Sequence, residues 1–154
     1  MAVAIATQKH GVVFPSKLLA GFGGAHQFNI TIAQNHDNGE LVNRGDWNSF
    51  DNYDEAETAV EFAGVIREAA AEGGYYVEVT APTEAVLLYN TPINPYTGRE
   101  FEDDALFYNA AGDVVRGYGL VKGDIFAVSE NMFQGTIAVG KAVSFANGKY
   151  VVAK

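Results

Sequence analysis

Residues 142–153 read AVSFANGKYVVA, and this stretch predicts the fold class of the chain. Asn147-Gly148 supplies two residues that tolerate the positive φ angles of a type I′ turn. The runs on either side, residues 142–146 and 150–153, are rich in residues that favour strands. The stretch therefore predicts a β-hairpin at the C-terminus.

Runs of the same kind recur every 8–12 residues upstream of this hairpin, which is typical of a compact β-barrel or β-sandwich. Most of the 17 glycines lie between apolar runs and indicate tight turns. Residues 85–89, AVLLY, are apolar on both faces and predict a buried strand. The expected strands are residues 27–32, 75–79, 85–89, 106–108, 114–118 and 125–128.

The N-terminal part of the chain is less regular. Phe28, Ile30 and Ile32 alternate with polar residues, so they predict one half-buried strand, with Leu41-Val42 as its hairpin partner after a turn. We expect residues 1–35 to form an irregular N-terminal arm and residues 36–154 to form a single β-rich domain.

One α-helix is predicted over residues 53–72. Asn52 can cap its start together with Glu55, and Gly73-Gly74 follows its end. Gly64 in the middle weakens this prediction, and a strand or an irregular segment is the alternative there. The apolar stripe that favours the helix consists of Ala59, Phe62, Ala63, Ile66 and Ala70.

The charge of the chain argues against several classes of partner. The 10 Lys and Arg residues against 19 Asp and Glu residues give a net charge of −9, with no basic cluster. A nucleic acid or an anionic membrane surface needs a basic face, so we expect neither as a partner. The chain has no cysteine, and its apolar start lacks the preceding basic residue of a signal peptide.

No pattern of reactive residues indicates catalysis, and we expect no catalytic residue, cofactor or metal site. His10, His26 and His36 do not have the spacing of metal ligands. The acids of residues 51–57 are interpreted as the first turn of the helix, and those of residues 100–104 as a solvated loop. Arg44-Gly45-Asp46 is interpreted as a turn. An enzyme whose site residues are dispersed along the sequence remains an alternative.

Residues 61–152 resemble the capsid decoration, or cement, proteins of tailed bacteriophages. The resemblance lies in GYYVEV at 74–79, EAVLLYNTP at 84–92, LFYNAAGDVVR at 106–116 and GDIFAVS at 123–129. It implies a non-enzymatic virion protein, assembled in the host bacterial cytoplasm, that binds the major capsid protein on the outer surface of the shell and stabilises it. It also implies a homo-oligomer.

Under this hypothesis, the contacts with the shell or with sister subunits come from the N-terminal region and from residues 90–104. A carbohydrate-binding or host-attachment β module of a phage fibre, with an exposed aromatic platform, is the alternative. The residues expected to make contacts are Phe14, Leu18, Leu19, Phe22, Phe28, Ile93, Tyr96 and Phe101.

Overall fold

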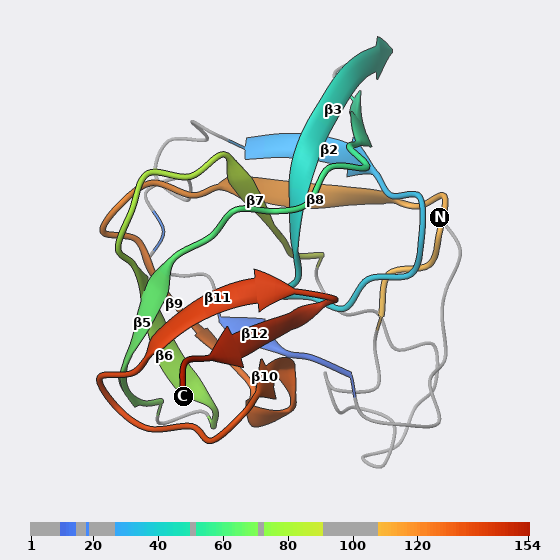
Figure 1. Ribbon diagram of the computed structural model, residues 1–154. Helices are drawn as coiled ribbons and strands as arrows, with labels where there is room; N and C mark the ends of the chain where they lie inside the picture. Colours follow the sequence, from blue (N-terminus) through green and yellow to red (C-terminus); the bar gives the residue numbers. More distant parts are fainter. Residues whose placement is uncertain (1–9, 15–17, 19–26, 50–51, 71–72, 91–107) are drawn as a thin grey trace, which may run out of the picture.

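The computed structural model describes residues 10–14, 18, 27–49, 52–70, 73–90 and 108–154, and these form two β-sheets (Figure 1). The prediction of a mainly β fold is confirmed. A 3-10 helix, η4, spans Glu130–Met132. The strands are β1 Val13–Phe14, β2 Gln27–Thr31, β3 Leu41–Ser49, β4 Asn52–Glu55, β5 Gly64–Ala69, β6 Tyr75–Val79, β7 Ala85–Leu88, β8 Val114–Gly119, β9 Ile125–Val128, β10 Phe133–Gln134, β11 Ala142–Ala146 and β12 Lys149–Val152.

One sheet is closed and the other is open. Strands β2-β4-β3-β7-β8 form a closed barrel, in which only the β2–β4 pair is parallel. The other sheet has seven strands in the order β1-β9-β6-β5-β11-β12-β10. Closure leaves the barrel without an unpaired edge, and the two outermost strands of the open sheet are only two residues long each.

Strand β7 is the wall between two hydrophobic cores. All four of its residues are buried, as the sequence predicted for this run. Val86 and Leu88 face the small core inside the barrel, whereas Ala85 and Leu87 face the larger core beneath the open sheet. The small core contains Ile30, Ile32, Val42, Val86, Leu88 and Val115.

Tyr150 on β12 is fully buried at the centre of the larger core. Its ring lies 5.0–5.9 Å from the rings of Phe62, Phe126, Phe133 and Phe145. Its hydroxyl donates a hydrogen bond of 2.6 Å to the carbonyl of Gly39. Burial, with the nearby charge of Glu40, raises the pKa of Tyr150 well above its usual value, so the hydroxyl keeps its proton and remains a donor.

The C-terminal hairpin forms as predicted. Strands β11 and β12 pair from Val143–Val152 to Ala146–Lys149. Asn147 has φ 52° and Gly148 has φ 76°, the positive pair that a type I′ turn requires.

The predicted helix over residues 53–72 is wrong, because this segment contributes strands β4 and β5. Phe62, Gly64 and Ile66 are buried while Ala63 is exposed, so burial here alternates with a period of two. Gly64 also allows a close approach: a Cβ atom there would lie 3.0 Å from the carbonyl of Glu78 on β6. The spacing of the apolar residues fitted both the helical periodicity and the strand periodicity. Pairing in the sheet selected the strand.

The predicted hairpin between residues 27–32 and Leu41-Val42 is also wrong. Phe28, Ile30 and Ile32 do line one face, but β2 pairs with β4 and β8, and Leu41-Val42 pairs with β7. A turn at residues 38–39 does precede β3, with Gly39 at φ 95°.

The described part of residues 1–35 contributes to both sheets. Strand β1 pairs with β9 at one edge of the open sheet, and β2 lies inside the barrel ladder. The expected loop at 91–98 and most of the expected strand at 106–108 lie outside the described residues.

Candidate functional site

The loop from His36 to Glu40, between β2 and β3, carries a buried charged cluster. Nδ1 of His36 lies 3.0 Å from Glu40 Oε1, and Nε2 lies 2.8 Å from Glu55 Oε1. Ionised carboxylates only accept hydrogen bonds, so the protonated imidazolium is the form of the ring that satisfies both contacts. Burial lowers the pKa of His36, but hydrogen bonds and charges from Glu40 and Glu55 outweigh burial and raise it above 6.5.

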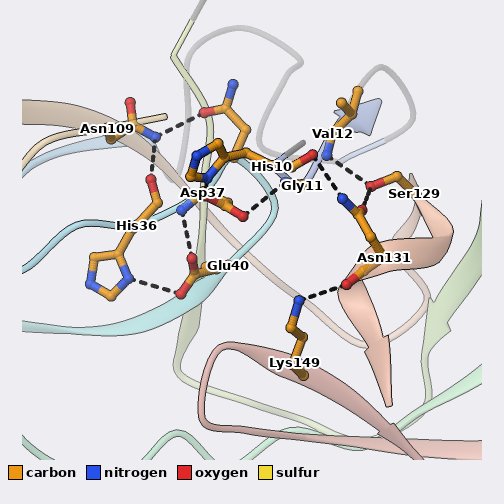
Figure 2. Close-up of polar contacts among 11 residues, drawn as sticks. His10, Gly11, Val12, His36, Asp37, Glu40, Asn109, Ser129, Asn131 and Lys149 are labelled. Carbon is orange, nitrogen blue, oxygen red and sulfur yellow. Dashed lines mark hydrogen bonds and ion pairs between the residues drawn. The ribbon is translucent and has the colours of Figure 1, made fainter. Parts of the chain in front are cut away.

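The neighbouring residues of this loop bind the N-terminal segment (Figure 2). Asp37 accepts a hydrogen bond of 2.8 Å from the amide of Gly11, and its other oxygen lies 2.5 Å from His10 Nδ1. The His10 ring also stacks on Tyr108 at 4.8 Å. Residues 10–11 are therefore held against the loop that joins β2 to β3.

A second set of polar contacts continues from the N-terminal segment to the open sheet. The amide of Val12 donates to the hydroxyl of Ser129, and that hydroxyl donates to Asn131. The side chain of Asn131 donates to the carbonyl of His10, and Lys149 on β12 donates to the carbonyl of Asn131 (Figure 2). These contacts cross-link distant parts of the chain.

A groove of about 810 Å³ lies beside the charged cluster, between the barrel and the turn of the C-terminal hairpin. Glu40, Glu55 and Phe145 are among its lining residues. Glu40 and Glu55 are bound to His36, and Glu55 also accepts from the amide of Ala33, so both carboxylates already serve the fold. Within the described ranges, no group of three or more His, Asp or Glu residues is arranged to hold a metal ion.

The acids that the sequence assigned to a helix start lie instead on and after β4. Glu55 binds His36, and Asp54 accepts a hydrogen bond of 2.5 Å from the side chain of Asn48 on β3. Asp51 and the acids of residues 100–104 lie outside the described residues.

Strands β3 and β4 form a ribbon that extends beyond the rest of the barrel (Figure 1). The register of this pair shifts between Arg44 and Trp47, which marks a β-bulge. Trp47 stands opposite Tyr53 in the ladder, and the residue is 60% exposed. The only tryptophan of the chain is therefore presented to solvent at a projecting position.

Arg44 lies at the base of this ribbon and contacts two aromatic rings. Its guanidinium carbon is 4.4 Å from the centroid of Phe28 and 4.7 Å from that of Tyr53. These two rings are nearly perpendicular to each other, at 88°. Such contacts are attractive and fix the orientation of the guanidinium.

The interpretation of Arg44-Gly45-Asp46 as a turn is wrong, because all three residues lie in β3. Gly45 is needed where β4 approaches closely: a Cβ atom there would lie 2.7 Å from the carbonyl of Asp54. The tripeptide thus marks the bulge of the ribbon.

The expected contact residues are scattered where the structure describes them. Phe14 on β1 and Phe28 on β2 are half-buried, whereas Leu18 is fully buried in the larger core and offers no surface in this chain. Trp47, Arg44 and Tyr53 were not among the expected residues. A single tryptophan between polar neighbours, Asp46 and Asn48, was the available signal for the ribbon. The expected residues outside the described ranges are Leu19, Phe22, Ile93, Tyr96 and Phe101.

In comparisons with known proteins, no family model, no curated protein and no solved structure matches this chain. Among the described residues, no helix has both the length and the apolar character that crossing a membrane requires.

Proposed function

We propose that this protein is a non-enzymatic structural protein of a phage virion that binds the outer surface of the capsid shell and stabilises it. The observation that carries the proposal is the projecting β3–β4 ribbon, which presents Trp47, a residue that is 60% exposed. Tryptophan is among the residue types that are enriched at the anchor positions of protein–protein contacts. The shell as the partner comes from the sequence resemblance.

The body that carries the ribbon is suited to a mechanical role. Its two hydrophobic cores meet at the buried strand β7, and hydrogen bonds from residues 10–12 link its distant parts. A protein that reinforces a shell must transmit force between attachment points without unfolding locally, and these cross-links oppose local opening. On a repeating lattice, several copies or an oligomer would add avidity to modest single contacts.

Co-sedimentation with undecorated capsid shells tests the proposal. We expect the full chain to pellet with the shells, and the Trp47→Ala variant to pellet at least about tenfold more weakly, as for an interface anchor. Val139→Ala is the matched control, because Val139 is 64% exposed but lies between β10 and β11, away from the ribbon. Wild-type protein that remains in the supernatant would rule out the proposal.

A carbohydrate-binding or host-attachment module is the second candidate, and the same tryptophan favours it. Sugar rings stack on exposed aromatic faces, and the hydrogen-bonded pair Asn48–Asp54 offers polar groups on the same ribbon. Saturable binding on a glycan array that Trp47→Ala abolishes, without any binding to shells, would establish this function instead.

A further inference from the structure

A pocket of about 330 Å³ opens beside the base of the ribbon. Its lining residues include Phe28, Arg44, Thr83, Glu84 and Leu120. Its volume falls in the range of small-ligand sites and is ample for one acidic side chain. We call it the Arg44 pocket.

Arg44 has no anionic partner in the part of the chain that the structure describes. The described ion pairs join His10, His36 and Arg67 to acids, and none involves Arg44 within 4.0 Å. Glu84 lines the same pocket, but no ion pair joins Glu84 to Arg44.

The guanidinium is also pre-oriented. Phe28 and Tyr53 hold it from two directions, at 4.4 Å and 4.7 Å, so little side-chain freedom remains to be lost when a ligand binds. The two rings are nearly perpendicular, so the planar guanidinium can stack flat on only one of them, and the N–H groups that do not point at the other ring remain available. That planar fork matches a carboxylate, which can accept two parallel hydrogen bonds.

We propose that the Arg44 pocket binds a carboxylate of the shell protein, an Asp or Glu side chain or a C-terminus, while Trp47 covers the adjoining apolar surface. The inference rests on the proposed function for the identity of the partner. Trp47 faces Tyr53 across the ladder, and Tyr53 contacts Arg44, so the three side chains form one continuous surface. Tryptophan, tyrosine and arginine are the residue types enriched where binding energy is concentrated.

The surrounding charge selects one carboxylate over a polyanion. Arg44 is the single cation of the ribbon and pocket, and Asp46, Asp54, Glu55 and Glu84 are their acids, so the local charge is +1 − 4 = −3. A phosphate chain carries several negative charges, so these acids would repel it over a longer range than they would repel a single carboxylate. A lone carboxylate can approach the guanidinium in bidentate geometry while the exposed acids stay hydrated.

Titration of the full-length 15N-labelled protein with benzoate, with benzamide as the neutral control, tests the chemistry. We expect benzoate at millimolar concentration to shift the Arg44 Nε–H and Trp47 indole resonances in a saturable way, and benzamide to leave them unchanged. Arg44→Lys keeps the charge but loses the fork, and should bind benzoate about tenfold more weakly. Glu84→Gln should bind it about twofold more tightly, because a like charge is removed from the pocket.

Arg116→Lys is the matched control, because Arg116 is an exposed arginine on another barrel strand, β8. It should bind benzoate as the wild type does. Equal binding of benzoate and benzamide, or an Arg44→Lys variant that binds benzoate as the wild type does, would overturn the carboxylate site.

Co-sedimentation with shells then tests the partner. We expect Arg44→Lys to bind shells about tenfold more weakly, and Arg116→Lys to bind as the wild type does. Wild-type binding to shells that Arg44→Lys leaves unchanged would overturn the inference but not the proposed function. Benzoate binding without any binding to shells would overturn the proposed function and the shell as the partner.

Discussion

At the scale of single residues, His36 shows how this chain uses a buried charge. An imidazolium between Glu40 and Glu55, at 3.0 and 2.8 Å, offsets the cost of burying two carboxylates. Glu40 belongs to the same loop as His36, just before β3, whereas Glu55 is the last residue of β4, so the cluster ties this loop to β4. Loss of the proton would leave two like charges close together.

The stability of the protein should therefore depend on pH through His36. The folded chain binds this proton more tightly than the unfolded chain, whose histidine has a pKa near 6.5. The stabilisation is complete below pH 6.5 and is lost as the pH rises through the raised pKa of the folded state. Thermal unfolding at a series of pH values should show the advantage of the wild type over His36→Gln shrinking as the pH rises. A constant difference would contradict this prediction.

Tyr150→Phe tests the buried hydroxyl. The change keeps the ring in the aromatic centre but leaves the Gly39 carbonyl without its 2.6 Å donor. We expect a loss of about 1–3 kcal/mol in the free energy of unfolding, measured by urea denaturation. A variant as stable as the wild type would show that the carbonyl finds another donor.

At the scale of elements, β7 separates the two hydrophobic cores. Its neighbouring residues Leu87 and Leu88 are both fully buried, but they face different cores. Shortening one of the two side chains therefore leaves a cavity in one core and does not affect the packing of the other.

Leu87→Ala and Leu88→Ala should each destabilise the protein by about 2–5 kcal/mol, because each leaves a cavity in a closed core. Denaturant unfolding of the two single variants measures this. A strand buried on one face only would give one large loss and one small loss, and that result would contradict the shared-wall architecture. Lys122→Ala, at an exposed position between β8 and β9, is a control expected to change stability little.

At the scale of the whole molecule, the polar contacts of residues 10–12 connect both sheets. Asp37 is the main acceptor for this segment, since it binds both His10 and the amide of Gly11. Val12 and Ser129 exchange two hydrogen bonds. The Val12 amide donates to the Ser129 hydroxyl, and the Ser129 amide donates to the Val12 carbonyl. The segment is therefore part of the folded body.

Asp37→Ala should loosen this segment without unfolding the molecule. We expect faster hydrogen exchange at the Ser129 amide, because its acceptor on Val12 is no longer held in place. The amide of Ile66 on β5, which donates to the Lys141 carbonyl, should exchange as before. Equal acceleration at both amides would indicate global destabilisation and contradict a local role.

The amino-acid sequence by itself determined the β class, the C-terminal hairpin and the double burial of residues 85–88. These features depend on turn chemistry and on the polarity of neighbouring residues, which are local properties. Tertiary structure alone decided that residues 64–69 are a strand, because pairing with β6 outweighed a spacing that also fitted a helix. It also decided which side chains meet on the ribbon. Strand pairing and a bulge bring Arg44, Tyr53 and Phe28 together, and the spacing of these residues in the sequence does not reveal either feature.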